Sequence, residues 1–345
     1  MAKVSYSVFI LRGQPFHLGH KAIIQEALQK TQAVLILIGS YRTPVTIKNP
    51  WSFEAREDMI RGSMTLDENA RILVRPIRDF LYSIHTWVTS LQNVVTVNTD
   101  GDDITLYGHF KDDSSFYLNL FPQWKLAQMP NIKSNGRSID STLIRNFMYE
   151  NNDSWRPLVT EYVASVLESY MQTDEFQRMV REFKFIENYK KTWEKAPYPP
   201  TFVTTDAVVV QSGHVLLVVR GREPGKGYYA LPGGFLNQGE SIRQCTIREL
   251  KEETKIDVPS VILDKCITDT VTFDHPLRDL RGRTISHASL IELDYNKPLP
   301  RIKGSDDAAE AVWMPFNELG LHEEKFFADH IHIIGRFMSG KLYNR

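Results

Sequence analysis

Acidic side chains gather in one short stretch of the sequence, between Gly234 and Ile256. Glu249, Glu252 and Glu253 would lie on one face of a helix, at positions i, i+3 and i+4. Carboxylates so close together repel one another unless a multivalent cation lies between them. Oxygen ligands favour Mg²⁺, with Mn²⁺ as the alternative. The stretch therefore predicts a divalent-metal site, and a metal bound there could activate water for hydrolysis.

The residues around these carboxylates predict a loop followed by a helix. Gly233 and Gly234 form a turn signal. Arg248 stands four residues before Glu252 and can pair with it along a helix. A solvated acidic helix face is the simpler interpretation of such a charge run. The apolar positions that recur at roughly helical spacing are Ile242, Cys245, Ile247 and Leu250.

The whole stretch resembles the Nudix box, Gly-x5-Glu-x7-Arg-Glu-apolar-x-Glu-Glu-x-Gly-apolar. The resemblance implies a magnesium-dependent hydrolase of phosphoanhydrides, in which Glu240 orients the loop. One position departs from the pattern, because Lys255 stands where the family has a glycine at the end of the helix. The positions that match are Gly234, Glu240, Arg248, Glu249, Leu250, Glu252, Glu253 and Ile256. The implied metal ligands are Glu249 and Glu253, assisted by Glu252 and the carbonyl oxygen of Gly234.

A second set of reactive residues follows the apolar run 4–11, which predicts a buried strand. A helical pattern then runs to Lys30, and 33–40 predicts a second strand. This order predicts a right-handed βαβ unit in a parallel sheet, with ligands at the carboxyl ends of the strands. The start of the helix is an anion site, because its free N–H groups point outward. His17 and His20 in this loop could donate hydrogen bonds to phosphate oxygens.

This loop resembles the Gly-x-x-x-Pro-x-His-x-Gly-His signature of nucleotidyltransferases, and is most similar to the archaeal type of nicotinamide-mononucleotide (NMN) adenylyltransferase. The second signature of that superfamily, Ile-Ser-x-Thr-x-Ile-Arg, is matched over 138–145, with Asp140 in place of the usual serine. Alone, this segment would be an ordinary helix start. The residues of the first loop whose fit is closest to the archaeal type are Arg12, Gln14, Pro15, Phe16, His17, Gly19 and His20.

The resemblance implies transfer of a nucleotidyl group with loss of pyrophosphate. Such transfer depends on positioning and charge neutralisation more than on a protein nucleophile. His17, His20 and Arg145 would hold the triphosphate. Trp87 is a candidate stacking face for a pyridine ring, or a core aromatic. The candidates for binding ATP and the mononucleotide are Arg12, Gly13, Gln14, Phe16, Gly39, Lys48, Asn49, Trp87, Ser141 and Thr142.

The fold class expected is α/β in both halves: a Rossmann-like nucleotidyltransferase with a parallel sheet, then a Nudix α/β/α sandwich. An amphipathic helix over 160–187 would close the first domain. A hairpin is expected around Ser212 and Gly213, and further strands over 262–273 and 286–293. The expected division is 1–187 for the first domain, 188–200 for a polar linker and 201–345 for the second domain.

The segment 303–315 resembles the ADP-ribose pyrophosphatase branch of the Nudix family. The resemblance implies that a carboxylate beyond the box serves as a base or as a further metal ligand. Arg220 and Arg222 are candidates for phosphate binding, or else surface charges. The candidate carboxylates, which the sequence does not rank, are Asp306, Asp307 and Glu310.

The composition describes an ordinary two-domain protein. The chain has 345 residues and a net charge of -1, which gives no reason to expect nucleic-acid or membrane binding. Cys245 and Cys266 have no metal or disulfide spacing, and Cys245 falls on the apolar side of the expected helix. No signal segment or bilayer-spanning run is recognised, so we expect a cytoplasmic protein. The oligomeric state is left open, a homo-oligomer included.

The two resemblances together imply an enzyme of NAD metabolism with ATP, NMN and ADP-ribose as substrates. Its first domain would make NAD, and its second would hydrolyse ADP-ribose to AMP and ribose 5-phosphate. One alternative keeps both enzyme classes but changes the acceptor to nicotinate mononucleotide or pantetheine phosphate, and the Nudix substrate to another nucleoside diphosphate. The other is a Nudix-derived regulator that senses ADP-ribose; against it, the box carboxylates are intact and no basic helix-turn-helix follows Trp313.

Overall fold

The computed structural model describes residues 5–99, 103–108, 113–129, 133–134, 137–305 and 308–342. The chain divides into two compact units, Met1–Arg181 and Glu182–Arg345. The division falls inside helix α7 (Asp174–Lys191), which runs past residue 187, where the first domain was expected to end. In the part of the chain that is described, no helix is long and apolar enough to cross a membrane.

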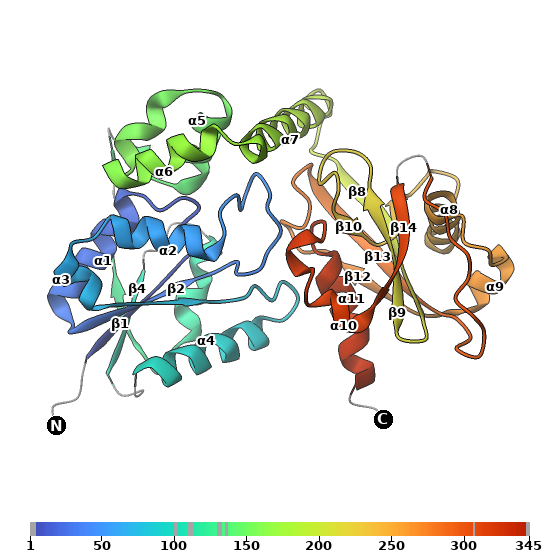
Figure 1. Cartoon of the computed structure of the whole chain (residues 1–345), viewed down its shortest axis with the longest axis horizontal. Helices are drawn as coiled ribbons and strands as arrows, with labels where there is room; N and C mark the ends of the chain where they lie inside the picture. Colours follow the sequence, from blue (N-terminus) through green and yellow to red (C-terminus); the bar gives the residue numbers. More distant parts are fainter. Residues whose placement is uncertain are drawn as a thin grey trace. The chain divides into compact units, whose positions relative to one another are not determined.

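The first unit is built on a five-stranded parallel sheet, as the sequence predicts (Figure 1). The strand order is β3-β2-β1-β4-β5, so the chain changes direction across the sheet between β3 and β4. Parallel sheets of this kind bind ligands in the crevice at such a switch point, here between β1 and β4. The strands are β1 (Tyr6–Leu11), β2 (Ala33–Ile38), β3 (Ile72–Pro76), β4 (Ile104–Gly108) and β5 (Lys125–Gln128).

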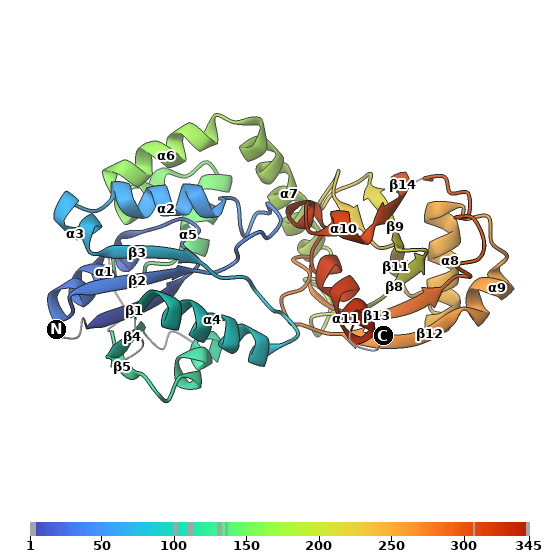
Figure 2. The same ribbon diagram turned by 60° about the horizontal axis from the view of Figure 1, so that its bottom comes forward.

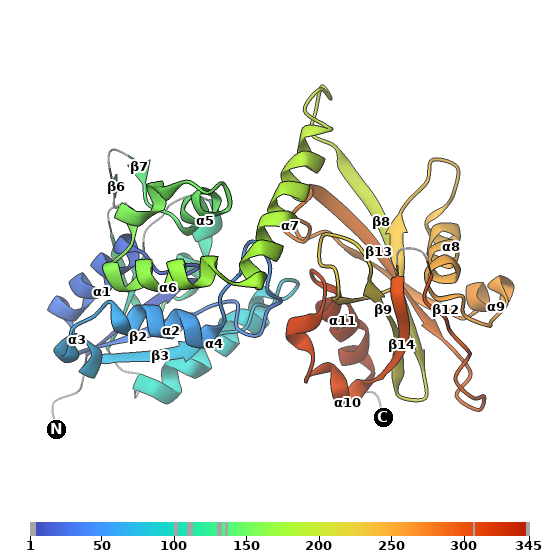
Figure 3. The same cartoon turned by 45° about the horizontal axis from the view of Figure 1, so that its top comes forward.

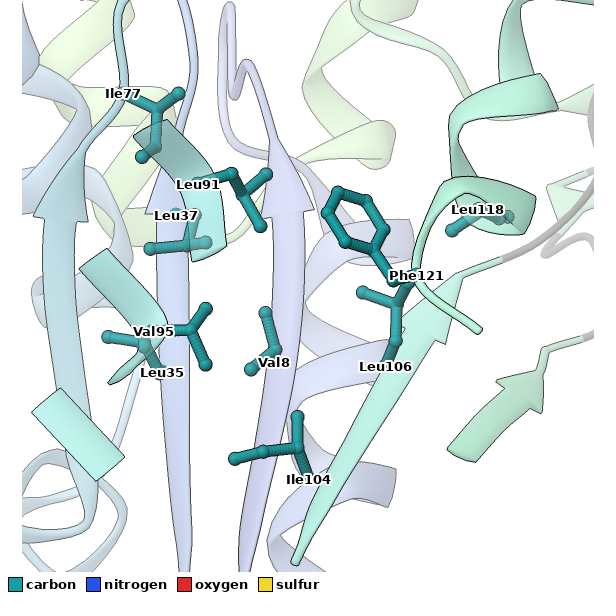
Figure 4. Close-up of a cluster of buried hydrophobic side chains, with 10 residues drawn as sticks. All are labelled: Val8, Leu35, Leu37, Ile77, Leu91, Val95, Ile104, Leu106, Leu118 and Phe121. Atoms are coloured by element: carbon teal, nitrogen blue, oxygen red, sulfur yellow. The ribbon is translucent and has the colours of Figure 1, made fainter. Parts of the chain in front are cut away.

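Helices cover both faces of this sheet. On one face, Leu91 and Val95 of α4 (Ile84–Thr99) pack against Val8, Leu35 and Leu37 of the strands (Figure 4). Figure 2 shows α2 (Phe53–Gly62) on the opposite side of the sheet from α4. Side chains alternate between the two faces along each strand, so the apolar runs of β1 and β2 supply both cores.

The remaining elements of the first unit are mostly short. The single helix expected over 160–187 is two helices, α6 (Glu161–Met171) and α7. The break follows from Thr173, whose hydroxyl accepts a hydrogen bond from the N–H of Phe176 (3.1 Å) and so begins a new helix. The others are α1 (Leu18–Lys30), α3 (Leu66–Ala70), η1 (Asp113–Leu120), β6 (Lys133–Ser134), β7 (Arg137–Ser138), α5 (Ser141–Tyr149) and η2 (Asp153–Leu158).

The second unit contains a mixed sheet in the order β10-β9-β8-β13-β12, to which β11 adds on β8 and β14 on β9. The predicted hairpin joins β8 to β9, and both Ser212 (φ 47°) and Gly213 (φ 76°) have the positive φ that such a turn requires. The strands are β8 (Thr201–Gln211), β9 (His214–Arg220), β10 (Tyr229–Ala230), β11 (Gly233–Phe235), β12 (Ile267–Phe273), β13 (Arg283–Glu292) and β14 (Ala308–Pro315).

Helices lie on both sides of this sheet, which confirms the predicted α/β/α sandwich. Figures 1 and 3 show α8 (Ile242–Thr254) and α11 (His330–Leu342) on opposite sides of β8 and β13. The strand predicted over 262–273 is wrong at its start, because α9 (Ser260–Lys265) follows Pro259, whose fixed φ suits the start of a helix. The short elements α10 (Phe316–Leu319) and η3 (Glu323–Lys325) precede α11.

Helix α8 ends in a left-handed residue, Lys255, with φ 45° and ψ 30°. Its N–H donates to the carbonyl oxygen of Lys251 (3.1 Å), as at a usual helix end. A glycine adopts this conformation without a clash at Cβ, which explains why the family pattern has glycine here. We expect Lys255→Gly to raise the free energy of unfolding by roughly 0.5–1 kcal/mol in chemical denaturation. The control Lys255→Ala keeps the Cβ and should gain nothing; equal effects of the two changes would contradict the explanation.

Candidate active sites

A buried arginine holds together the two loops that follow β1 and β2. Arg56 of α2 is 1% exposed. Its guanidinium donates to the carbonyl oxygens of Arg12 (2.8 Å), Gly39 (2.7 Å) and Ser40 (3.2 Å). These carbonyls lie just beyond the ends of the two strands, so Arg56 fixes the spacing of the loops where ligands are expected. The sequence analysis did not assign this role.

Arg145, a predicted phosphate ligand, also contacts backbone carbonyls in this structure. It is 7% exposed and donates to the carbonyl oxygens of Ile47 (3.0 Å) and Gln14, and to Oγ1 of Thr142 (3.2 Å). The Gln14 side chain in turn pairs with the backbone of Trp51, donating to its carbonyl (2.9 Å) and accepting from its N–H (3.0 Å). Three loops are thus tied together: 12–17, 40–51 and the start of α5.

The two histidines of the first signature lie against each other. The rings of His17 and His20 stack with centroids 3.6 Å apart and planes 20° from parallel. His17 precedes the first residue of α1, so both rings lie at the start of a helix. Phe16 is fully buried beneath them, 5.6 Å from the ring of His20. A Cβ on Gly19 would lie 3.0 Å from the ring of His17, so this glycine makes room for the stacked pair.

Positive charge gathers beside these loops. Burial, together with the charges of Arg12 and Arg145, lowers the pKa of Lys48 to about 8, against the opposing effect of the Asp79 carboxylate. Asp79 is held by the N–H (3.2 Å) and hydroxyl (2.6 Å) of Ser40. Four cationic side chains, those of Arg12, Lys48, Arg56 and Arg145, thus lie in one partly buried region with the carboxylate of Asp79. Such an excess is stabilised by a polyanion, and a triphosphate meets that requirement.

The titration of Lys48 gives a testable pH dependence. The ammonium group loses its proton as pH rises through about 8, and neutral Lys48 would attract phosphate less. If Lys48 contacts the triphosphate, kcat/KM for ATP should fall above pH 8, because this ratio reports the free enzyme. The matched variant Lys48→Arg keeps its charge, so its profile should stay level to a higher pH. Identical profiles would remove Lys48 from the triphosphate site.

Four other residues predicted to bind ATP or the mononucleotide differ in their backbone conformation and side-chain contacts. Gly13 has a φ of 62°, and Ser141 donates to the carbonyl oxygen of Pro15 (3.1 Å). The Oδ1 atom of Asn49 is buried and has no hydrogen bond among the described residues, as expected of a group that a ligand completes. Trp87 packs edge-on to Tyr117 with centroids 5.9 Å apart and adjoins the core cluster, so part of its ring is used in packing.

The second unit contains a cavity of about 380 Å³. Among the predicted residues, those that line it are Arg220, Arg222, Gly234, Glu249 and Glu253. Glu252 and Glu310 are not part of its lining, and Asp306 and Asp307 lie outside the described residues. Glu310 is an exposed residue of β14. Within the described ranges, no group of three or more His, Cys, Asp or Glu side chains is close enough to hold a metal ion.

Burial disfavours the charged form of the two box carboxylates in the cavity. Burial raises the pKa of Glu253 to about 7, against a hydrogen bond from the N–H of Gly233 (3.0 Å). Burial also raises the pKa of Glu249, which Arg248 partly offsets at 2.8 Å. Carboxylates in this state bind a divalent cation, so the chemistry of the donor set fits the predicted metal.

Arg248, which lines the cavity, also connects two box residues that do not, Glu240 and Glu252. It pairs with Glu240 at 2.6 Å and with Glu252 at 2.9 Å. Glu240 also accepts the N–H of Asn237 (2.8 Å), and the hydrogen bonds from Arg248 lower the pKa of Glu240 to about 2. Glu240 therefore ties the loop to the helix. The Glu252 side chain is 57% exposed, pairs with Arg248 and is not part of the cavity lining.

The cavity also contains charged residues that the sequence analysis missed. Asp206 of β8 is 5% exposed, and Arg278 forms a two-pronged ion pair with Asp329 (2.9 and 2.8 Å). The Nδ1 atom of His330 accepts the N–H of Leu231 (2.8 Å). A carboxylate inside the apolar run of β8 was a signal that could have found Asp206. Arg278 and His330 carry no comparable signal, because the fold alone brings them to the cavity.

Comparisons with known proteins show the family of each unit. Residues 14–206 match the family model described as cytidylyltransferase-like, and residues 200–337 match the NUDIX domain. A structure from Francisella tularensis is described as a bifunctional NMN adenylyltransferase/ADP-ribose pyrophosphatase complexed with AMP and an Mn ion. It covers 98% of this chain and 99% of its own, at 34% identity and a TM-score of 0.88. The chain belongs to this bifunctional family.

Each half of this bifunctional family member also has separate relatives. A nicotinamide/nicotinic acid mononucleotide adenylyltransferase of Acinetobacter baylyi is 38% identical over 151 residues, 44% of this chain and 78% of the relative. An ADP-ribose pyrophosphatase of Methanocaldococcus jannaschii is 34% identical over 139 residues, 40% of this chain and 74% of the relative. The two signatures recognised in the sequence therefore belong to two families that also occur alone.

The first glycine of the box makes room for a carboxylate. A Cβ added to Gly234 would lie 2.5 Å from Cδ of Glu249, so Gly234→Ala must displace that carboxylate from the cavity. We expect Gly234→Ala to lower Nudix hydrolysis by roughly 10- to 100-fold, as for other changes that misplace a metal ligand. Gly239→Ala is the matched control, because nothing lies within 4 Å of its added Cβ. Equal hydrolysis rates for the two variants would contradict the role of Glu249.

Proposed function

We propose that this chain is a bifunctional enzyme of NAD metabolism. The first unit transfers the adenylyl group of ATP to NMN, giving NAD and pyrophosphate. The second unit hydrolyses ADP-ribose to AMP and ribose 5-phosphate. The observation that carries the proposal is that one chain contains both an excess of cations at a nucleotidyltransferase loop and buried carboxylates at a Nudix box. The names of the relatives of each half support the substrates.

In the first unit, an oxygen of the NMN phosphate bonds to the α-phosphorus of ATP while the bond to pyrophosphate breaks. Arg12, Lys48 and Arg145 would offset the negative charge of the phosphates. His17 and His20, at the start of α1, would donate hydrogen bonds to phosphate oxygens. The bonds of Arg56 and Arg145 to backbone carbonyls hold the loops in place before ATP arrives.

In the second unit, a water oxygen adds to a phosphorus of the anhydride and the P–O–P bridge breaks. A divalent cation bound here would acidify a water molecule and neutralise the pyrophosphate. Glu249 and Glu253 would hold the cation, and Arg220 and Arg222 would contact phosphate oxygens. We propose Mg²⁺ as the cation; the Mn ion of the Francisella structure supports a divalent ion of this size and ligand preference.

The test is chromatography of the reaction products of the purified full chain. With Mg²⁺, ATP and NMN we expect NAD and pyrophosphate, and with Mg²⁺ and ADP-ribose we expect AMP and ribose 5-phosphate. Nicotinate mononucleotide and pantetheine phosphate, supplied in parallel, test the alternative acceptors. Consumption of ATP with one of these but not with NMN would overturn the proposed acceptor. Removal of divalent ions with EDTA should stop ADP-ribose hydrolysis.

A further inference from the structure

One buried carboxylate of the second unit precedes the Nudix domain in the sequence. Glu182 lies on α7 and is 3% exposed, whereas the NUDIX match begins at residue 200. Its Oε2 atom accepts the backbone N–H of Gly225 (3.3 Å). Burying a carboxylate costs several kcal/mol unless hydrogen bonds and opposite charge compensate for it. Glu182 is not in either signature, so its burial needs a reason of its own.

Gly225 belongs to the loop that joins β9 to β10, and this loop is tightly confined. Gly225 has a φ of 75°, and an added Cβ would overlap the ring of Phe327. The end of the loop is hydrogen-bonded to its start. The N–H of Gly227 donates to the carbonyl oxygen of Arg220 (2.8 Å), and the N–H of Arg220 donates to the carbonyl oxygen of Tyr228 (2.9 Å). The loop therefore lies between Glu182 on one side and Phe327 on the other.

The same loop holds the guanidinium of Arg220. Its Nε atom donates to the carbonyl of Pro224 (2.9 Å), and its Cζ atom lies 3.9 Å from the centre of the Phe327 ring. Arg220 lines the cavity together with Glu249 and Glu253. Burial lowers the pKa of Arg220, and the charge of Glu182 is among those that oppose this shift. Glu182 thus acts on Arg220 in two ways, through the loop and through its charge.

We propose that Glu182 is a positioning residue of the hydrolase site, which holds the Gly225 loop so that Arg220 faces the pyrophosphate of the substrate. The proposal rests on the proposed hydrolase function. It assigns to the hydrolase a residue that lies outside the NUDIX match. Because Arg220 would contact the pyrophosphate both in the bound substrate and in the transition state, its misplacement should affect KM more than kcat.

The experiment compares variants of the full chain in ADP-ribose hydrolysis. Glu182→Gln keeps an oxygen for the N–H of Gly225 but loses the charge, and Glu182→Ala loses both. We expect KM to rise by roughly 10-fold for Glu182→Ala and less for Glu182→Gln, with kcat changed by less than about twofold. Glu187→Gln is the matched control, because Glu187 lies on the same helix and pairs only with Lys190 (2.9 Å) among the described residues. NAD formation should be unchanged in all three.

The decisive measurement is a double-mutant cycle with Arg220→Ala. If Glu182 acts through Arg220, adding Glu182→Ala to Arg220→Ala should raise KM no further. Additive effects, or a loss of kcat with unchanged KM, would overturn the proposal. A wild-type chain that hydrolyses another nucleoside diphosphate but not ADP-ribose would overturn only the proposed substrate, and the cycle would be run with that compound. If no nucleoside diphosphate is hydrolysed, both proposals fail.

Discussion

Glu253→Gln should lower ADP-ribose hydrolysis by at least about 100-fold, since loss of a group that only orients a metal ligand already costs about 10- to 100-fold. The amide keeps an oxygen to accept the N–H of Gly233, at 3.0 Å in the native chain, so the fold should be retained. Burial raises the pKa of Glu253 to about 7, which means that a neutral side chain is tolerated there. Divalent-ion binding, followed by the electron paramagnetic resonance of Mn²⁺, should weaken in parallel.

Glu252→Gln is the matched control for this change, because Glu252 is outside the lining of the cavity. We expect Glu252→Gln to cost much less activity than Glu253→Gln, because the only ion pair that it should weaken among the described residues is the one with Arg248. NAD formation should be normal in both variants. Hydrolysis retained by Glu253→Gln would refute the assignment of the metal site to this helix.

His17→Ala should lower NAD formation by on the order of 10²–10³-fold, the usual cost of removing one donor to a charge that develops in the transition state. The stacked partner, His20, would lose its neighbour at 3.6 Å as well. Hydrolysis of ADP-ribose should be unchanged, because His17 belongs to the first unit. The measurement is the initial rate of NAD formation at saturating ATP and NMN.

His85→Ala serves as the control in the first unit, since His85 is an exposed residue of α4. It should leave both activities unchanged. The opposite patterns expected for His17→Ala and Glu253→Gln would separate the two activities on one chain. Normal NAD formation by His17→Ala would exclude the histidine loop from the transfer reaction.

The sequence could predict those features that lie in one continuous stretch. The first strand, its histidine loop and α1 follow one another directly, as do the glycine turn and α8 of the second unit. Local spacing therefore predicted a loop for each candidate site, and alternating secondary structure predicted the parallel sheet. The two family resemblances supplied the chemistry that spacing alone leaves open.

The sequence could not predict how the carboxylates of α8 would divide. At about 100° per residue, Glu253 stands about 40° to one side of Glu249 and Glu252 about 60° to the other side. All three share a face by sequence, but only Glu249 and Glu253 line the cavity, whereas the Glu252 side chain is 57% exposed and pairs with Arg248. The direction of the cavity follows from the packing of α8 on the sheet, which the helical pattern does not contain.

The sequence also could not predict which residues, distant along the chain, the fold brings together at a site. Asp206 and His330 come from β8 and α11, and each is a single polar residue without a motif around it. Likewise, the signature predicted a phosphate-binding role for Arg145 but could not reveal its bonds to the carbonyls of Gln14 and Ile47. Those contacts depend on the positions of two loops that are distant in sequence from Arg145. The strands of the sheet determine these positions.

The bonds of Arg56 and Arg145 to loop carbonyls bear on the thermodynamics of nucleotide binding. Backbone that is already held by hydrogen bonds loses little conformational entropy when a ligand arrives. The histidine loop would then behave as a preformed receptor, in which affinity reflects charge and contact rather than the ordering of the chain. The heat-capacity change on ATP binding should accordingly correspond to the surface buried at the nucleotide itself, with no added contribution from coupled folding.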